Sequence, residues 1–364
     1  MLGAADVAGY LLDRNLLSPR AVVHGRLRVE DASRLNRVFV VTAQRERCYV
    51  VKLPGAAGGA GVAREAAVLE RLGALDTDGS LTSRLPLLVA YDEADGVLIL
   101  ESAPDARDLR GRHARGRFSR ALAGEAGRAL ALLHALPPAA LDGLPPVRHP
   151  IWGTQVHRPD LDMLRTLSAT AMELTRIVQG LDELCAELDD LLASWSEESV
   201  IHGDIRWDNC VALRGANSSR WTRLQLIDWE LCGAGDPGFD IGAFFGEYLR
   251  AWLQSIPIVD AGDPGRLLAH ARLPLRRMRP ALRAFWDAYA LHRGTSGAEL
   301  SGTLRRATRF AAVRLLTAAL EEAQTLAELR ASVLYLLPLS HNVLRRPDEA
   351  SAHLLGVGAS GAAA

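Results

Sequence analysis

Hydrophobic and polar positions divide the chain into a β-rich first part and a mainly helical second part. In the first part, an apolar pattern with helical spacing predicts a helix over residues 4–19. A second helix is predicted over 62–72, followed by a strand–turn–strand unit over 85–103. Runs of β-branched and aromatic residues predict three further strands that form an antiparallel meander, at 21–30, 37–44 and 47–54.

Helical periods dominate the second part of the chain. Apolar residues such as Leu122, Ala126 and Leu130 recur at near-helical spacing, which predicts an amphipathic helix over 118–136. One strand-rich island, residues 199–231, interrupts the helices. A β-rich region followed by a helical region favours an α+β fold made of two lobes with a cleft between them.

The same change of pattern sets the expected domain boundaries. We expect a small antiparallel N-terminal lobe with one key helix over residues 1–102 and a larger helical lobe over 103–355. The last residues, 356–364, read GVGASGAAA. Because such small residues have little apolar surface to bury, we expect a flexible tail there.

The composition, with 49% hydrophobic and 23% charged residues, is that of a soluble globular protein. The net charge of −1 creates no field that attracts nucleic acid or a membrane surface, so neither is expected as a partner. The first residues lack the basic start of a secretory signal, and no apolar run reaches the roughly 20 residues of a membrane-spanning helix. The four cysteines form no CxxC pair, which favours isolated thiols in a cytoplasmic protein.

Lys52 is the one lysine among 42 basic residues, and all the others are arginine. A chain that uses arginine everywhere else indicates that this position needs a compact point charge on a thin stem, which the wide guanidinium does not provide. Lys52 lies near the end of the predicted strand CYVVKLP. A narrow slot beside the phosphates of a nucleotide is a place with this requirement.

Three polar residues of the strand-rich island have types and spacing suited to phosphoryl transfer. Asp204 follows an apolar run in the tripeptide HGD, Asn209 comes five residues later, and Asp228 ends the next apolar run. Phosphoryl transfer needs a group that accepts the proton of the attacking hydroxyl, together with oxygen ligands for a metal that holds the phosphates. We therefore expect Asp204 to be the catalytic base, and Asn209 and Asp228 to be metal ligands.

The segments HGDIRWDN (202–209) and LIDWELCGAGDPGFDIGAFF (226–245) resemble the aminoglycoside-phosphotransferase family, whose fold is protein-kinase-like. The order of motifs agrees with that family from Val23 to Tyr248. The resemblance implies a bilobal kinase that uses ATP and Mg²⁺ to transfer the γ-phosphate to a hydroxyl group.

The resemblance also implies roles for residues outside these three. Lys52 would contact the α- and β-phosphates, and Glu65 would pair with it, with Glu70 as the alternative if the register of the helix differs. Asp240, in GDPGFD, would support the catalytic loop through hydrogen bonds, and His202 would orient that loop.

For the nucleotide, backbone groups at Leu100 to Ala103, around Glu101, are expected to meet adenine. Ser33 and Asn36 lie in the polar turn DASRLNR, and both are candidates for phosphate contacts. This turn lacks the glycines of a protein-kinase loop, and an ordinary hairpin turn is an equal alternative.

The catalytic loop departs from the usual family pattern at two positions. Arg206 is expected either to neutralise the transferred phosphate or to face the acceptor. Trp207 is expected to pack in the core rather than to form a wall of the acceptor site.

Charge near the C-terminus guides the prediction of the acceptor. Between Gly265 and Arg346 there are 14 Arg and five acidic residues, an excess of +9 that suits an acidic peptide or an anionic metabolite, unless these arginines only line solvated helix faces. A second, weaker resemblance is to the phosphotransferases that accompany HopA1-like lyases in lanthipeptide and thioamitide biosynthesis. It implies a Ser or Thr of a precursor peptide as acceptor and a lyase as partner. The alternatives are a small-molecule kinase acting on an aminoglycoside, sugar or amino alcohol, and a pseudokinase scaffold.

Overall fold

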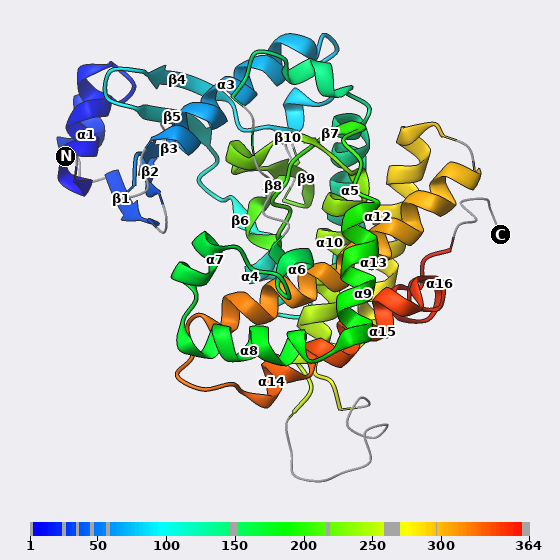
Figure 1. Cartoon of the computed structure of the whole chain (residues 1–364). Coiled ribbons are helices and arrows are strands. Elements are labelled where there is room, and N and C mark those ends of the chain that lie inside the picture. Colours follow the sequence, from blue (N-terminus) through cyan, green and yellow to red (C-terminus); the bar gives the residue numbers. More distant parts are fainter. Residues whose placement is uncertain are drawn as a thin grey trace.

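The computed structural model describes residues 3–23, 27–33, 36–43, 47–55, 59–145, 147, 152–215, 219–257, 270–295 and 297–358. A sheet with a helix on each face forms the N-terminal part, drawn in blue and cyan in Figure 1, and a larger helical part follows it, drawn in green to red. The fold is therefore α+β, as predicted. Within the described ranges, no helix has the length and apolar character needed to cross a lipid bilayer.

The N-terminal sheet has the strand order β1-β2-β3-β5-β4 and is antiparallel throughout. Its strands are β1 (Leu27–Asp31), β2 (Arg37–Ala43), β3 (Cys48–Leu53), β4 (Leu88–Asp92) and β5 (Val97–Ser102). Helix α1 (Ala4–Asp13) packs on one face of the sheet, and α3 (Ala60–Leu75) packs on the other. The predicted meander and the strand–turn–strand unit are confirmed.

Alternation along β3 decides which helix each of its side chains meets. Tyr49 and Val51 belong to the apolar cluster that includes α1. Lys52 lies between Val51 and Leu53, so its side chain points to the opposite face of the sheet. Its partner in the ladder, Leu98, belongs to the cluster that includes the apolar residues of α3. The two-residue period of the strand thus directs Lys52 toward α3.

Four long helices form the centre of the helical part, with α12 packed on α5 and α10 packed along α13. They are α5 (Arg120–His134), α10 (Pro237–Gln254), α12 (Leu275–Arg293) and α13 (Gly297–Ala323). The contact between α10 and α13 is close at Gly242, where an added Cβ would lie 2.5 Å from the carbonyl oxygen of Ala307. Only glycine permits this approach of the two backbones.

Shorter helices cover the outside of this part. Among the described residues they are α4 (Leu109–His113), α6 (Trp152–Gln155), α7 (Leu161–Thr166), α8 (Ala169–Gln179), α9 (Asp182–Ala193), α14 (Ala331–Leu334), α15 (Leu336–Arg345) and α16 (Pro347–Ala350). The predicted amphipathic helix over 118–136 corresponds to α5, which begins after the N-cap Ser119.

Two small sheets carry the predicted strand-rich island. They consist of β7 (Ser199–Ile201) with β10 (Gly233–Gly235), and of β6 (Arg107–Asp108), β8 (Cys210–Arg214) and β9 (Trp221–Leu226). Residues 202–209 connect β7 to β8, and residues 227–232 connect β9 to β10. Both connecting segments therefore begin and end on paired strands, which hold them next to each other.

The predictions for the first thirty residues were wrong in detail. The helix predicted over 4–19 ends at Asp13, because Asn15 adopts a left-handed conformation with φ 57°. Residues 21–23, predicted as the start of a strand, belong to α2 (Pro19–Val23). Proline is favoured at the first position of a helix since its φ is already helical.

The prediction of a flexible tail from residue 356 was also wrong at its start. Val357 is 2% exposed, and its N–H donates to the carbonyl of Ser351 at 2.9 Å. Arg283 donates to the carbonyl of Gly356 at 2.6 Å. The apolar side chain of Val357 thus anchors this segment to the helical part, while residues 359–364 lie outside the described residues. The lobe boundaries at 102 and 355 stay predictions.

Candidate active site

Lys52 lies between two carboxylates. Its Nζ is 2.6 Å from Glu65 Oε2 on α3 and 2.7 Å from Asp228 Oδ1. Burial alone would lower the pKa of Lys52, but the two carboxylates outweigh it and raise that pKa. Burial alone would likewise raise the pKa of Asp228, but the Lys52 ammonium outweighs it and lowers that pKa. Lys52 and Asp228 are therefore both charged at neutral pH.

The backbone of Asp228 is strained in a way that aims its carboxylate. Its φ of 71° and ψ of 65° are left-handed, which is uncommon for a non-glycine residue. The next residue, Trp229, is fully buried, and its indole N–H donates to the carbonyl of Leu226 at 2.8 Å. Its backbone N–H donates to Glu65 Oε1 at 3.3 Å. The core position of Trp229 and the contact to Glu65 hold Asp228 in this conformation.

Asp240, in the first turn of α10, holds the segment 202–209 through hydrogen bonds to its backbone. It is fully buried and accepts hydrogen bonds from the backbone N–H groups of His202 at 2.7 Å and Gly203 at 3.0 Å. His134 Nε2 lies 3.1 Å from the same carboxylate. Burial alone would raise the pKa of Asp240, but these hydrogen bonds and the nearby imidazoles lower it. The carboxylate therefore stays ionised and fixes the backbone that precedes Asp204.

His202 contributes through hydrogen bonds to the two connecting segments. Its Nε2 is 3.1 Å from the carbonyl oxygen of Ile227, and its Nδ1 is 3.3 Å from the backbone nitrogen of Asp204. Nε2 therefore carries the proton and donates to Ile227, while Nδ1 accepts from Asp204. The imidazole thus links the segment that holds Asp204 to the residue before Asp228.

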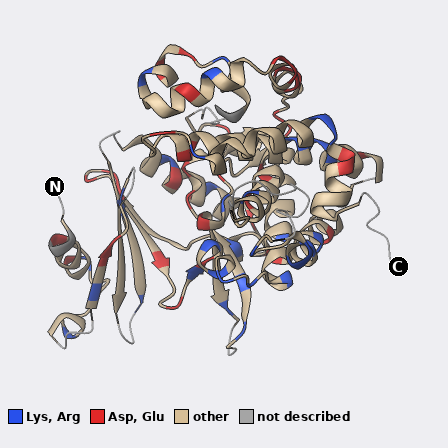
Figure 2. Ribbon diagram, turned by 90° about the horizontal axis from the view of Figure 1, so that it is seen from below, with Lys and Arg blue, Asp and Glu red and all other residues tan. Residues whose placement is uncertain are grey.

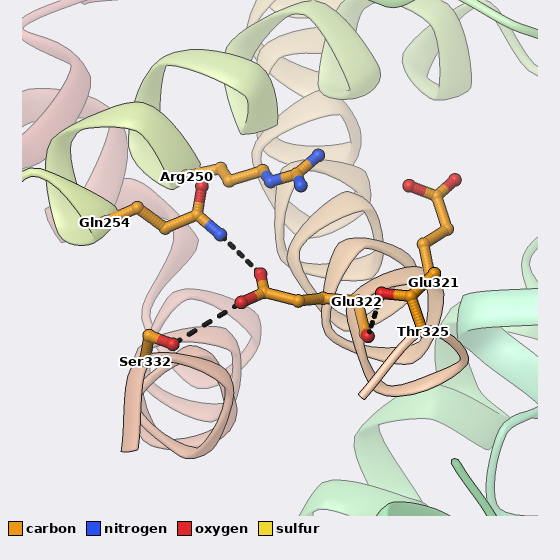
Figure 3. A pocket seen from close by; sticks show the side chains of 6 residues that line it. All are labelled: Arg250, Gln254, Glu321, Glu322, Thr325 and Ser332. Atoms are coloured by element: carbon orange, nitrogen blue, oxygen red, sulfur yellow. Dashed lines mark hydrogen bonds between the residues drawn. The ribbon is translucent and has the colours of Figure 1, made fainter. Parts of the chain in front are cut away.

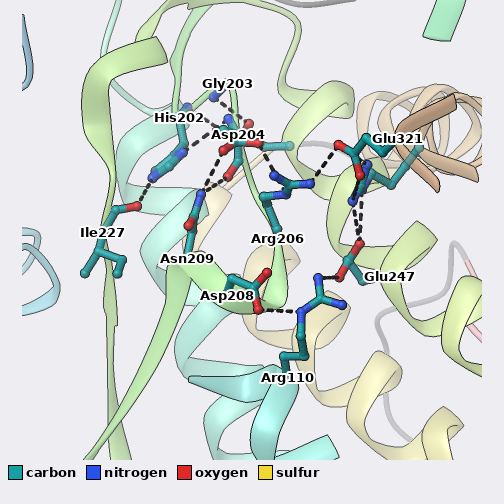
Figure 4. A network of polar contacts seen from close by, with 12 residues as sticks. Arg110, His202, Gly203, Asp204, Arg206, Asp208, Asn209, Ile227, Glu247 and Glu321 are labelled. Carbon is teal, nitrogen blue, oxygen red and sulfur yellow. Dashed lines mark hydrogen bonds and ion pairs between the residues drawn. The ribbon is translucent and has the colours of Figure 1, made fainter. Parts of the chain in front are cut away.

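Asn209 bridges Asp204 and the segment that carries Asp228. Its Nδ2 donates to both Oδ2 and the carbonyl oxygen of Asp204, each at 2.9 Å (Figure 4). The main-chain carbonyl of Asn209 accepts a hydrogen bond from the N–H of Ile227 at 3.0 Å. Asp204 keeps 31% of its side-chain exposure, and Arg206 Nε lies 3.7 Å from its Oδ1. Burial raises the pKa of Asp204 despite this arginine, which suits a carboxylate that has to accept a proton.

The chemistry of Asn209 and Asp228 fits a hard divalent cation. Because the amide nitrogen of Asn209 is bound to Asp204, its amide oxygen remains as a neutral donor, and Asp228 supplies an anionic oxygen. Mg²⁺ is commonly held by one or two such oxygens together with phosphate oxygens. Among the described residues, no group of three or more His, Cys, Asp or Glu is arranged as a metal site.

The remaining predicted residues differ in their positions. Glu70 is exposed on α3, so the partner of Lys52 is Glu65. The hydroxyl of Ser33 accepts from the N–H of Val38 at 3.1 Å, within its own turn. Glu101 lies on β5, and its N–H donates to the carbonyl of Leu87 at 2.8 Å. Among the described residues, neither Ser33 nor Glu101 forms a hydrogen bond or an ion pair with Asp204 or Lys52.

Asn36 and Glu230 form a contact that the sequence analysis did not predict. Asn36 Nδ2 donates to Glu230 Oε2 at 2.8 Å, which joins the turn before β2 to the segment after Asp228. Burial raises the pKa of Glu230. Gly61, on α3, leaves the room for this carboxylate, since an added Cβ there would lie 2.4 Å from Glu230 Oε2. The sequence offered one indication that Glu230 lies near the site, which is its position two residues after Asp228.

Arg64 is another residue that the sequence analysis missed. It is 8% exposed, and its Nη2 donates to the carbonyl of Cys232 at 2.6 Å, while its Nη1 donates to the carbonyl of Pro145. Since Arg64 precedes Glu65 on α3, these bonds fasten the helix beside the residue that meets Lys52. A buried arginine next to Glu65 gives no pattern in the sequence that separates it from the other arginines.

A network of ion pairs extends from Asp204 into the helical part (Figure 4). Arg206 donates to Glu321 at 2.7 Å. Arg314 lies 3.3 Å from Glu321 and 2.9 Å from Glu247, whose side chain is 1% exposed. Burial alone would raise the pKa of Glu247, but Arg314 and neighbouring arginines outweigh it and lower that pKa. Arg206 thus joins the segment 202–209 to α13.

Arg110 on α4 connects the same network to Asp208, in the segment 202–209. Arg110 lies 3.4 Å from Glu247 and also donates to Asp208. Trp207, between Arg206 and Asp208, is 4% exposed and packs edge-on against Tyr248 at 4.9 Å between ring centroids. Trp207 therefore packs in the core, as predicted. The charged residues on either side of it have different partners, since Arg206 binds Glu321 and Asp208 binds Arg110.

A pocket of about 530 Å³ opens beside this network, between α10, α13 and α14 (Figure 3). It is lined by Arg250, Gln254, Glu321, Glu322, Thr325 and Ser332. Glu321 belongs to both the network and the pocket, so a chain of contacts through Arg206 and Glu321 links Asp204 to the pocket. The pocket is open to solvent, and all six of its lining side chains are polar or charged.

The arginines that suggested a basic acceptor face are largely bound to other groups. On α12, Arg277 and Arg279 donate to main-chain carbonyls. Others pair with carboxylates, namely Arg305 with Asp348, Arg306 with Glu198, Arg309 with Asp190 and Arg345 with Glu183. Figure 2 shows basic and acidic residues interspersed over the helical part. Most of the arginines behind the excess of +9 are therefore held by carboxylates or main-chain carbonyls.

Two solved structures have a similar fold. The ADP-bound aminoglycoside phosphotransferase APH(2'')-Ib has a TM-score of 0.51 at 14% identity, over 94% of this chain and 99% of that one. The GDP complex of aminoglycoside 2'-phosphotransferase-IIIa has a TM-score of 0.51 at 13% identity, over 95% of this chain and 100% of that one. The likeness to these structures confirms the bilobal, protein-kinase-like fold.

Comparisons of the sequence identify one curated relative and one matching family model. A 4-hydroxytryptamine kinase of Psilocybe cyanescens is 42% identical over 78 residues, which is 21% of this chain and 22% of the length of that relative. The match thus spans about a fifth of the relative. The family model described as "Phosphotransferase enzyme family" matches residues 28–285. Because that stretch includes both lobes and well over half of the chain, the protein belongs to the phosphotransferase enzyme family.

Proposed function

We propose that this kinase transfers the γ-phosphate of ATP, with Mg²⁺, to a hydroxyl group of a small molecule. The observation that carries the proposal is the assembly of Lys52, Glu65 and Asp228 on one side and of Asp204 with Asn209 on the other, joined through the bond between Asn209 and Ile227. A scaffold that does no chemistry has no need for this set. The ADP and GDP in the two similar structures support a nucleotide as donor.

Each residue then has a defined task. Lys52, held by Glu65, binds the phosphates of the nucleotide, and the carboxylate of Asp204 accepts the proton of the acceptor hydroxyl. Asn209 and Asp228 would hold Mg²⁺, which neutralises charge on the phosphates when it is bound. We propose residues 1–102 as the nucleotide-binding lobe and 103–355 as the lobe that binds the acceptor.

A small molecule is favoured over a peptide as acceptor because of the pocket beside Arg206. The pocket shares Glu321 with the ion-pair network that contains Arg206 and Asp204. The peptide acceptor and the HopA1-like lyase partner were predicted mainly from a basic C-terminal face. Since most of those arginines have carboxylate or carbonyl partners, that argument loses its force. The peptide acceptor stays a prediction and is an outcome of the test below.

The direct test is the substitution Asp204→Asn. We expect phosphate transfer to fall by about 10²- to 10⁴-fold, since a general base contributes an effect of this size, while ATP binding is retained. Transfer is measured by mass spectrometry with an aminoglycoside panel, small amino alcohols and Ser-containing precursor peptides. ATP binding is measured by titration calorimetry.

The exposed Arg276, on α12, offers the control Arg276→Gln, which should leave transfer unchanged. Unchanged turnover in the Asp204→Asn protein would show that another group is the base. ATP binding without transfer to any acceptor would return the pseudokinase alternative to consideration.

A further inference from the structure

Two oppositely charged side chains line the pocket beside Arg206, yet they do not pair with each other (Figure 3). Arg250 extends from α10 and Glu322 from α13. In the described part of the chain no ion pair joins them, and Gln254 lies between them, donating to Glu322 at 2.7 Å. Opposite charges that face one cavity without neutralising each other leave two binding groups for a ligand.

Arg250 is the less satisfied of the two groups. Its side chain is 17% exposed, and its carboxylate neighbour, Glu247, is 3.9 Å away. Its Nε is buried without a hydrogen-bond partner. Glu247 is engaged much more closely by Arg314, at 2.9 Å. A guanidinium has five N–H donors in a planar fork, and a carboxylate on a ligand would match that geometry.

Glu322 offers the complementary charge. Its carboxylate accepts from Gln254 and, at 3.4 Å, from the hydroxyl of Ser332, both of which are neutral donors. Glu321, its neighbour, is different because Arg206 and Arg314 already neutralise it. Among the described residues Glu322 has no cationic partner, so its carboxylate is available to an ammonium group.

We propose that the pocket binds an acceptor that carries an ammonium group and a carboxylate besides the hydroxyl, as a hydroxy amino acid does. The carboxylate meets Arg250, the ammonium meets Glu322, and the hydroxyl reaches past Arg206 toward Asp204. This inference rests on the proposed function and specifies the class of its acceptor.

The proposed reaction balances without a further reactant. The acceptor oxygen forms a bond to the γ-phosphorus of ATP, and the bond from that phosphorus to the bridging oxygen of ADP breaks. The electron pair of the broken bond leaves with ADP, and the hydroxyl proton passes to the Asp204 carboxylate. The products are ADP and a phosphorylated amino acid.

Other acceptors fit the two charges less well. A polycation would satisfy Glu322 but would bring like charge to Arg250, and an internal Ser of a peptide has neither a free ammonium nor a free α-carboxylate. A simple amino alcohol leaves Arg250 without a counter-charge. Only an acceptor with both charges satisfies both residues.

The test compares three acceptors that differ by one group: L-homoserine, 3-aminopropan-1-ol, which lacks the carboxylate, and 4-hydroxybutyrate, which lacks the ammonium. Initial rates are measured with ATP and Mg²⁺, and kcat and KM are obtained for each acceptor. We expect kcat/KM for L-homoserine to exceed that of either analogue by about 10- to 100-fold, the usual effect of one charged hydrogen bond.

Two substitutions that remove charge assign the two binding groups. Arg250→Gln should raise KM for L-homoserine by about 10- to 100-fold without changing KM for 3-aminopropan-1-ol, and Glu322→Gln should do the same with 4-hydroxybutyrate as the insensitive acceptor. Arg276→Gln is the control for the loss of one arginine. A merely structural role of Arg250 or Glu322 would change KM for all three acceptors alike.

Several results would overturn the inference. They are equal kcat/KM for L-homoserine and 3-aminopropan-1-ol, transfer only to a peptide or an aminoglycoside, and ATP binding with no transfer to L-homoserine. Equal kcat/KM values, or transfer only to an aminoglycoside, leave the proposed function intact, because a small-molecule hydroxyl is still phosphorylated. Transfer only to a peptide contradicts both the inference and the small-molecule acceptor. Absence of both ATP binding and transfer would instead contradict the proposed function itself.

Discussion

Lys52 occupies a slot between two carboxylates that suits an ammonium and not a wider cation. Its contacts of 2.6 and 2.7 Å are both made by the single Nζ atom, and its side chain is 8% exposed. A guanidinium spreads its charge over three nitrogens and needs more room. The structure thus gives a physical reason for the one lysine in a chain that otherwise uses arginine.

We predict that Lys52→Arg lowers kcat/KM for ATP by about 10- to 100-fold, as expected when one charged hydrogen bond is lost. The reason is steric, because the positive charge is retained. Steady-state kinetics with ATP as the varied substrate measure the effect. The control Arg276→Lys, an equally conservative change at an exposed position, should have no effect. A fully active Lys52→Arg enzyme would mean that the lysine has no special task.

At the scale of elements, helices α10 and α13 form a unit that carries both the ion-pair network and one wall of the pocket. Gly242 and Gly246, one turn apart on α10, allow the close approach, since added Cβ atoms would meet Ala307 O and Arg314 Cβ at 2.5 and 2.6 Å. At this separation Glu247 reaches Arg314 with its side chain buried. Small residues on one helix therefore determine the charge pairing between two.

We predict that Glu247→Gln lowers the free energy of unfolding by about 3–5 kcal/mol, because it leaves Arg314 and Arg110 without their buried counter-charge. Urea denaturation followed by circular dichroism measures the change. The double variant Glu247→Leu with Arg314→Met should recover much of the loss, since a pair of apolar residues buries no charge. If the double variant is as unstable as the single one, the loss is due to packing and not to charge.

The effect of Glu247 should depend on pH in a defined direction. Its pKa is lowered in the folded protein, where the nearby arginines outweigh burial, compared with about 4.3 in the unfolded chain. Its stabilisation is therefore fully present above the unfolded pKa and is lost as the pH falls through the lower folded pKa. We expect the difference in unfolding free energy between wild type and Glu247→Gln to be constant from about pH 6 to 8 and to shrink below about pH 4. A difference that grows toward acid would contradict this assignment.

At the scale of the whole molecule, few side chains fasten the sheet to the helical part around the candidate site. Arg64 runs from α3 to the carbonyls of Cys232 and Pro145, and Asn36 joins the turn before β2 to Glu230. Both links end on the segments next to Asp228. The position of α3, and with it the pairing of Glu65 with Lys52, therefore depends on contacts between the two parts of the molecule.

We predict that Arg64→Met raises KM for ATP by about 3- to 10-fold and leaves KM for the acceptor unchanged, since α3 then loses two hydrogen bonds to carbonyl groups. Kinetics with each substrate varied in turn separate the two parameters. The matched control is Arg71→Met, on the same helix, where a bond of 3.3 Å to the carbonyl of Ala140 is lost farther from Glu65. Equal effects of the two variants would show a general loosening of α3.

The sequence by itself determined the elements with a strong period and the residues whose chemistry is unusual. The two-residue alternation of the strand CYVVKLP sets Lys52 on the face opposite Val51, and the spacing of Asp204 and Asn209 placed both on one connecting segment. Such features depend on neighbours a few residues away, and local backbone geometry is enough to predict them.

Only the tertiary structure decided the choice of Glu65 over Glu70, the links made by Arg64 and Glu230, and the pocket with Arg250 and Glu322. Each of these joins residues far apart in the chain, for which no local pattern exists. The arginines show the same point most clearly. Counted along the chain, the arginines between Gly265 and Arg346 form an excess of +9, and only their positions in space reveal that most are bound to carboxylates or carbonyls. Arg250 lies outside that stretch, and only the structure shows that it lines the pocket.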